Sequence, residues 1–195
     1  ASAVAQAGPA SLAMTRGSAP VQAVPKYAYV ANQGGGNVSQ YTIVASGGLA
    51  PMTPATVGAG PSPRSVSVDP SGKYAYVANF GGNTVSQYTI GASGTLAPMN
   101  PATVTAAGGG PFAVTVDPAG KYAYVANRLD NTVLQYTIGA SGGLALMSPG
   151  AAVATGTNPW SISVDPSGKY AYVANDGGNV SQYAVGASGG LTPMG

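Results

Sequence analysis

Apolar and polar residues alternate along much of the chain, and the alternation is that of strands. Residues 65–68 read Ser-Val-Ser-Val, one polar and one apolar face. Residues 73–79 are apolar on both faces, which is typical of a strand buried between two sheets. No segment carries the 3.6-residue spacing of an amphipathic helix. The pattern predicts an all-β protein.

The strands belong to a long internal repeat. The heptapeptide Lys-Tyr-Ala-Tyr-Val-Ala-Asn occurs four times, and successive copies begin 47 or 48 residues apart, at 26–32, 73–79, 121–127 and 169–175. A period of this length is typical of propeller blades. We predict a β-propeller of four four-stranded blades in a single domain, 1–195, with blades at about 20–58, 62–107, 110–155 and 158–195.

The two ends of the chain suggest how the ring closes. The last unit stops at 191–194, level with 96–99 of the second unit, and so lacks most of an outer strand. Residues 9–17 align with the missing piece, so we expect this N-terminal strand to complete the last blade, preceded by a flexible segment, 1–8. Pairing of this kind removes exposed sheet edges. The alternative is that two chains form one eight-bladed ring by exchanging terminal strands.

Charge is sparse, and this excludes several classes of function. Only 6% of residues are charged and the net charge is +2, which provides no basic patch for nucleic acid. No apolar run is long enough to span a membrane. The first residues, Ala-Ser-Ala, resemble what remains after a signal peptide is removed. We therefore expect an extracytoplasmic location: periplasmic, secreted or on the cell surface.

The repeat also carries a family resemblance. The sequence Asp-Pro-Ser-Gly-Lys-Tyr-Ala-Tyr-Val-Ala-Asn resembles the YVTN-type β-propeller repeat, and residues 83–90 are similar to a strand of the 6-phosphogluconolactonase-like group. The resemblance covers nearly the whole chain. It implies a propeller, usually of seven blades in lactonases, found in surface-layer proteins, binding modules and lactonases. It also implies that the hydrolases use His, Glu and Arg side chains around the central channel.

The residues that differ between repeats are the candidate site. Seven charges recur with the repeat and are expected at one end of the strands, whereas Arg16, Arg64, Arg128, Asp130 and Asp176 are expected in loops at the other. Large side chains also follow the Pro that opens an inner strand or the Asn that ends the second strand. Because loops at a propeller mouth present recognition residues, we predict a ligand or partner site comprising Arg64, Phe80, Phe112, Arg128, Trp160 and Asp176.

The sequence offers little for catalysis or metal binding. It contains no His, Cys or Glu, so it lacks the usual general base and the ligands of soft metals. Asp69, Asp117 and Asp165 share one turn position and are interpreted as turn caps. Calcium bound by Asp130, Asp176 and Asn side chains is the alternative. We predict no catalytic residue, no metal and no cofactor.

These observations favour a non-enzymatic scaffold or binding module that acts through one loop face. We expect a protein partner or self-association, with a small-molecule ligand as an option at the channel mouth. A lactonase-type hydrolase, in which Arg64 or Arg128 holds a carboxylate or phosphate, is one alternative. A self-assembling surface protein is another.

Overall fold

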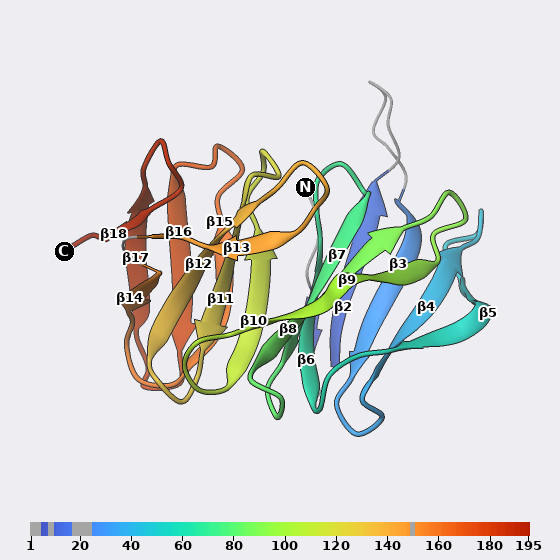
Figure 1. Ribbon diagram of the computed structural model, residues 1–195, viewed down its shortest axis with the longest axis horizontal. Coiled ribbons are helices and arrows are strands. Elements are labelled where there is room, and N and C mark those ends of the chain that lie inside the picture. The colour runs from blue at the N-terminus through green and yellow to red at the C-terminus, as the bar shows by residue number, and fades with distance from the viewer. Residues whose placement is uncertain (1–4, 8–9, 17–24, 149–150) are drawn as a thin grey trace.

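The computed structural model describes residues 5–7, 10–16, 25–148 and 151–195. Within these ranges the chain has no helix, and its strands form four antiparallel sheets placed one after another (Figure 1). The all-β, propeller-like architecture is confirmed. No segment of these ranges is a helix that could cross a membrane.

The four sheets follow the four repeats. The first contains β1 (Ala5–Ala7), β2 (Ala10–Arg16), β3 (Pro25–Asn32), β4 (Asn37–Ile43) and β5 (Leu49–Gly58). The second contains β6 (Pro63–Val68), β7 (Tyr74–Asn79), β8 (Thr84–Ile90) and β9 (Leu96–Thr105). The third contains β10 (Pro111–Val116), β11 (Tyr122–Asn127), β12 (Thr132–Ile138), β13 (Leu144–Leu146) and β14 (Ala152–Ala154). The fourth contains β15 (Pro159–Val164), β16 (Tyr170–Asn175), β17 (Val180–Val185) and β18 (Leu191–Pro193).

A capped turn joins the inner strand of each complete repeat to the second strand. In the second sheet, the Oδ1 atom of Asp69 accepts hydrogen bonds from the backbone N–H groups of Lys73 and Tyr74, at 2.8 and 2.7 Å. Gly72 takes the left-handed conformation that ends the turn, with φ of 71°. In the fourth sheet, hydrogen bonds from Ser167 and from the Tyr170 backbone lower the pKa of Asp165 to about 2. The predicted turn-capping role of these aspartates is confirmed.

The apolar core lies between consecutive sheets. Strand β7 illustrates this: Ala75 and Val77 pack against the first sheet, and Tyr76 and Ala78 pack against the third. A third cluster joins the third sheet to the fourth. The inner strands β2, β6, β10 and β15 lie side by side in that order. Burial on both faces of the heptapeptide strand is therefore what stacks the blades.

The predicted role of the N-terminal strand is wrong. Strand β2 pairs with β3, with Ala10 opposite Asn32, and so forms the inner strand of the first sheet instead of completing the last. The reason is the length of the first repeat, which has only five residues between its Pro20 and Lys26, too few for an inner strand and a turn. Residues 5–7, expected in a flexible segment, pair with β2 as β1.

The four described sheets form an open arc. The first and fourth sheets lie at opposite ends of the molecule (Figure 1), and the contacts between inner strands run from the first sheet to the fourth without joining these two. Tyr172 of the fourth sheet is 41% exposed, whereas its counterpart Tyr124 in the third sheet is fully buried. The face of the fourth sheet that points away from the third is thus less covered than the equivalent face of the third sheet.

Candidate functional site

The inner strands of three sheets each begin with a β-bulge, and the bulged residue belongs to the predicted site. The pairing of β6 with β7 shifts between Pro63 and Ser65, which leaves Arg64 outside the regular ladder. Phe112 and Trp160 occupy the equivalent positions of β10 and β15. A bulge redirects its side chain away from the alternation of the strand. The same β-bulge therefore places three different side chains, Arg64, Phe112 and Trp160, at equivalent positions of three consecutive sheets.

A second row of side chains follows the ends of the second strands. Each residue of this row donates its backbone N–H to the carbonyl of the residue before the proline, at 2.9 to 3.0 Å, and the row comprises Phe80, Arg128 and Asp176. The accepting residues have left-handed φ angles between 50° and 66°, and they are Ser62, Gly110 and Asn158. One hydrogen bond per blade thus holds the second row beside the first.

The two rows interleave as a ladder of cations and aromatic rings. The Arg64 guanidinium lies 5.2 Å from the Phe80 ring centre and 5.0 Å from that of Phe112. The Arg128 guanidinium lies 5.4 Å from the Phe112 ring centre and 4.9 Å from that of Trp160. The rings also touch, with centres 5.9 Å apart for Phe80 and Phe112 and 4.5 Å apart for Phe112 and Trp160. We call these five side chains the Arg–aromatic ladder.

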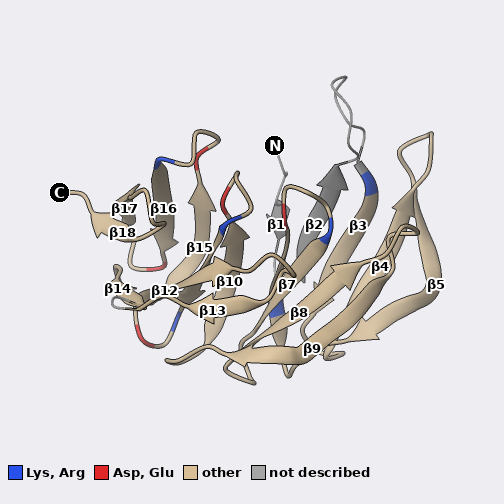
Figure 2. Cartoon of the chain, turned by 45° about the horizontal axis from the view of Figure 1, so that its top comes forward, with Lys and Arg blue, Asp and Glu red and all other residues tan. Residues whose placement is uncertain are grey.

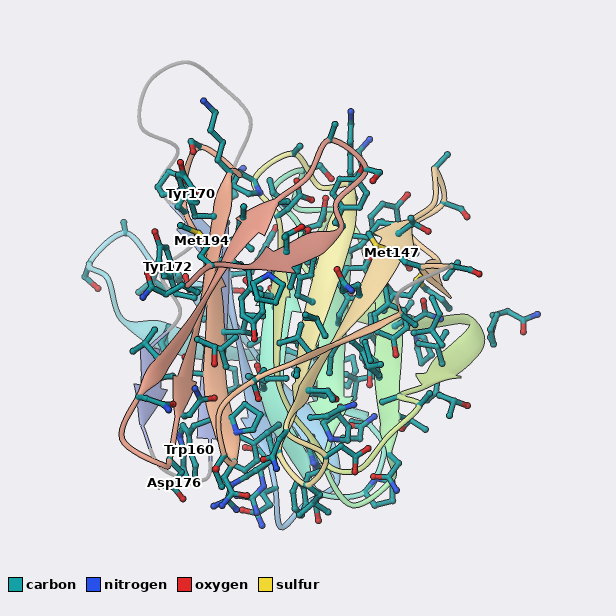
Figure 3. The ribbon with its side chains drawn as sticks, turned by 90° about the vertical axis from the view of Figure 1, so that its left-hand side faces the viewer. Met147, Trp160, Tyr170, Tyr172, Asp176 and Met194 are labelled. Carbon is teal, nitrogen blue, oxygen red and sulfur yellow. The ribbon has the colours of Figure 1, made fainter. Side chains whose placement is uncertain are left out.

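The ladder lies at one end of the strands. Figure 3 shows Trp160 and Asp176 together at the lower end, far from Tyr170, which lies near the turns that follow the inner strands. Charged residues gather at the strand ends, and the bodies of the sheets are almost free of them (Figure 2). The structure brings together all six residues of the predicted site. Their binding role stays a prediction.

The electrostatics of the ladder differ between its two arginines. Arg128 forms an ion pair with Asp176, with Nη2 and Oδ2 3.1 Å apart, whereas Arg64 has no carboxylate partner among the described residues. The Nε atoms of both arginines are buried without a described hydrogen-bond partner. Burial lowers the pKa of Arg64, and the nearby charge of Arg128 lowers it further. The site has surplus positive charge, which suits an anion.

The asparagine that ends each heptapeptide supports the site, and the sequence analysis did not single it out. Asn79 is buried, and its Nδ2 donates to the Oγ atoms of Thr84 and Ser86 at 3.1 and 2.8 Å. The Oδ1 atoms of Asn79, Asn127 and Asn175 are buried without a described partner. An asparagine occupies this position in every repeat, directly before the second row of side chains, and this pattern in the sequence could have identified it.

The other charged residues predicted at this end behave differently. The register of β2 places Arg16 opposite Pro25, at the end of the strands that carries the repeated lysines, so its predicted location is wrong. Asp130 accepts a hydrogen bond from the N–H of Gly109 at 2.6 Å and caps a loop. Among the residues that the structure describes, no group of three or more acidic side chains is arranged to hold a metal ion.

The chain is similar to known propellers along its length. The profile of the family described as "Lactonase, 7-bladed beta-propeller" matches residues 18–195. No curated protein matches the sequence.

Several solved structures share the fold. One is a protein of unknown function from Desulfotomaculum acetoxidans, with a TM-score of 0.74, 19% identity, and coverage of 100% of this chain and 65% of that one. A putative 6-phosphogluconolactonase from Bacteroides fragilis has a TM-score of 0.76, 21% identity, and coverage of 98% and 68%. The periplasmic gluconolactonase of Pseudomonas aeruginosa has a TM-score of 0.75, 22% identity, and coverage of 94% and 53%. At such identities these likenesses show the fold alone, and the chain spans roughly half to two thirds of each structure's length.

The expectation that the chain is not an enzyme is overturned. The family whose profile matches the chain is described as one of lactonases, and this finding contradicts the expectation. The expectation rested on the absence of His, Cys and Glu. These are the side chains most often used as bases, but the site also contains the Asp176 carboxylate, which pairs with Arg128.

Proposed function

Because the chain belongs to the lactonase family of seven-bladed β-propellers, we propose that it takes part in the hydrolysis of an anionic sugar lactone, which it holds at the Arg–aromatic ladder. The observation that carries this proposal is the unpaired Arg64. Its guanidinium lies between two rings, without a described carboxylate partner. This side chain can donate two parallel hydrogen bonds to a carboxylate or phosphate.

The surroundings of Arg64 favour a charged ligand that also has an apolar surface. Trp160 is the partly exposed ring of the ladder, 38% accessible, so it can pack on a sugar ring, whereas Phe112 is buried between the two arginines. Within the ladder and its ion pair, the described charges are two arginines and one aspartate, which leave a net positive charge. A phosphorylated lactone has both properties, and two similar structures bear names of lactonases that act on gluconolactone or its phosphate.

The proposed chemistry uses groups of the site in the roles that lactone opening requires. Water adds to the ester carbonyl, and the bond between the carbonyl carbon and the ring oxygen breaks to give a hydroxy acid. Asp176 accepts the proton of the attacking water, and this proton passes to the departing ring oxygen. Arg128, 3.1 Å from Asp176, donates to the negative charge that develops on the carbonyl oxygen. Arg64 holds the remote anionic group and fixes the position of the ring.

Removal of Arg64 tests the proposal. We expect Arg64→Ala to lower kcat/KM for 6-phosphogluconolactone about 100-fold, because a charged hydrogen bond of this kind contributes about 1.5–3 kcal/mol. Hydrolysis of unphosphorylated gluconolactone should change less, since it lacks the group that Arg64 holds. The measurement is lactone hydrolysis followed by acid release.

Lys73→Ala is the matched control, because Lys73 is a cation at the opposite end of the strands, where it follows the Asp69 turn. It should leave both rates unchanged. Equal losses on both lactones in Arg64→Ala, or no turnover of any lactone by the wild-type chain, would refute the proposed role.

We also propose that the chain works outside the cytoplasm. The support is the periplasmic location named for the Pseudomonas aeruginosa structure. Fractionation of the native cells, followed by detection of the chain with an antibody, tests this.

A further inference from the structure

The loop after β11 departs from the repeat at Leu129. The second residue after the asparagine that ends each heptapeptide is a leucine here, whereas the other repeats have Gly34, Gly81 and Gly177. Leu129 is 62% exposed, which exceeds the exposure of every other large apolar side chain that the structure describes. One exposed leucine is common on a protein surface, so the surroundings of Leu129 decide whether it has a role.

The loop before β10, which contacts the loop of Leu129, also departs from the repeat. It is one residue longer than the equivalent loops before β6 and β15, and it contains the run of three glycines at 108–110. Each of these loops is counted from the residue that donates its N–H to the residue before the third strand, and they run from Ala106 to Pro111, from Ala59 to Pro63 and from Thr155 to Pro159. Two neighbouring loops of the third sheet thus differ from the repeat together.

Three hydrogen bonds join these two loops. The backbone N–H of Leu129 donates to the Gly109 carbonyl at 3.1 Å. The N–H of Arg128 donates to the Gly110 carbonyl at 2.9 Å. In return, the Gly109 N–H donates to Oδ2 of Asp130 at 2.6 Å. The backbone around Leu129 is therefore held by the neighbouring loop, although the Leu129 side chain is exposed to solvent.

Leu129 borders the Arg–aromatic ladder at Phe80. A Cβ atom on Gly110 would lie 2.8 Å from the Phe80 ring and 2.9 Å from the Leu129 side chain, so these two side chains are neighbours. Phe80 is only partly buried, and the Arg64 guanidinium lies 5.2 Å from its ring centre. We call Leu129 and Phe80 the apolar patch. It lies beside the cation to which the proposed function assigns the anionic group of the ligand.

We propose that the ladder prefers anions that carry an apolar group, alkyl or aryl, directly beside the anionic group, and that Leu129 sets this preference. The inference rests on the proposed function, in which Arg64 holds the anion. With the anion on Arg64, a neighbouring apolar group covers the apolar patch, and the burial of both surfaces stabilises the complex. Within the proposed reaction, the favoured substrate is a lactone with an apolar substituent next to its anionic group. Arg64 thus selects for charge, and Leu129 selects among charged ligands.

Two alkyl phosphates test this inference, because they share the charged group and differ only in the apolar group. We expect butyl phosphate to bind the full chain about 10-fold more tightly than methyl phosphate, as follows when its three additional CH₂ groups are about half buried. Binding of butyl phosphate should also have the more negative heat-capacity change, which is the signature of apolar burial. Isothermal titration calorimetry at several temperatures measures both quantities.

Substitutions at Leu129 show whether this residue carries the preference. In Leu129→Ser the preference for butyl phosphate should fall to about 3-fold or less, because most of the apolar surface of the side chain is removed. The affinity for methyl phosphate should stay the same. Leu129→Met keeps an apolar side chain and should keep the preference.

Leu146→Ser is the matched control. Leu146 is a leucine of β13 in the same sheet and is 39% exposed, and Figure 3 shows its neighbour Met147 far from Trp160. This variant should leave both affinities unchanged. Circular dichroism checks that all variants are folded.

The outcomes separate this inference from the proposed function. Equal affinities of the wild-type chain for the two phosphates would overturn the inference and leave the anion site intact. So would a preference that persists in Leu129→Ser, since the apolar group would then lie elsewhere, for example on the Trp160 ring. Failure of both phosphates to bind, or unchanged binding in Arg64→Ala, would overturn the anion site of the proposed function and this inference with it.

Discussion

Replacing Tyr124 by alanine is expected to lower the free energy of unfolding by about 4 kcal/mol, since removal of a buried aromatic side chain leaves a cavity. Tyr124 is fully buried between the third and fourth sheets, and its hydroxyl donates to the Gly189 carbonyl at 2.7 Å. The substitution removes both the packing and the hydrogen bond. Urea denaturation followed by circular dichroism measures the change.

The repeat supplies a matched control for this prediction. Tyr172 is the same residue of the heptapeptide one blade later, but it is 41% exposed. Tyr172→Ala should therefore lower the free energy of unfolding by less than about 1 kcal/mol. Equal losses at the two positions would contradict the described burial.

Gly142→Ala is expected to cost about 3 kcal/mol, through strain and overpacking together. The residue has φ of 83°, and an added Cβ would lie 2.3 Å from the Tyr74 ring, whose hydroxyl is held by the Ala140 carbonyl at 3.2 Å. The ring cannot move away without losing this bond. Thermal or urea unfolding of the variant measures the cost.

Gly47→Ala separates the cost of backbone strain from the cost of overpacking. Gly47 has almost the same φ as Gly142, but no atom lies within 4 Å of its Cβ position, so alanine should cost only the backbone strain, about 1 kcal/mol. If both alanines cost the same, contact with the tyrosine ring contributes nothing to the interface between sheets.

The fold could be predicted from the sequence because one short pattern recurs. The heptapeptide has small or aromatic residues on both faces, and only a strand between two sheets buries both. The turn Asp69-Pro70-Ser71-Gly72 fixed where the inner strand ends. The similarity of residues 9–17 to the piece missing from the last unit predicts the wrong sheet, because the short spacing from Pro20 to Lys26 leaves no room for another inner strand in the first unit.

The repeat did not predict whether the four sheets close into a ring. The hydrogen bonds of Tyr76 and Gln87 to the next sheet join residues 66 and 57 positions apart, and no local pattern in the sequence reveals such contacts. The exposure of Tyr172 and Leu49 appeared only once the sheets were placed.

A comparison of repeats predicted which side chains lie together at one end of the strands, and the structure places them there, whereas their binding role stays a prediction. Positions that differ while the scaffold stays constant pointed to Arg64, Phe112 and Trp160 at one end of the strands. The alternation of arginine and aromatic side chains in the ladder depends on the β-bulges, and no local sequence pattern predicts these bulges. The absence of His, Cys and Glu then argued against an enzyme, although the Asp176 carboxylate beside Arg128 leaves room for lactone chemistry.

The central claim is that the Arg–aromatic ladder binds an anionic sugar acid, and the fluorescence of Trp160 measures this directly. Trp160 is the only tryptophan of the chain, and the Arg128 guanidinium lies 4.9 Å from its ring centre. Titration with 6-phosphogluconate, the acid formed when the phosphorylated lactone opens, should give a saturable change in emission. The apparent affinity obtained from this titration should be at least about 10-fold weaker for Arg64→Ala than for the wild type. No change in emission, or equal affinities for the wild type and Arg64→Ala, would contradict the account.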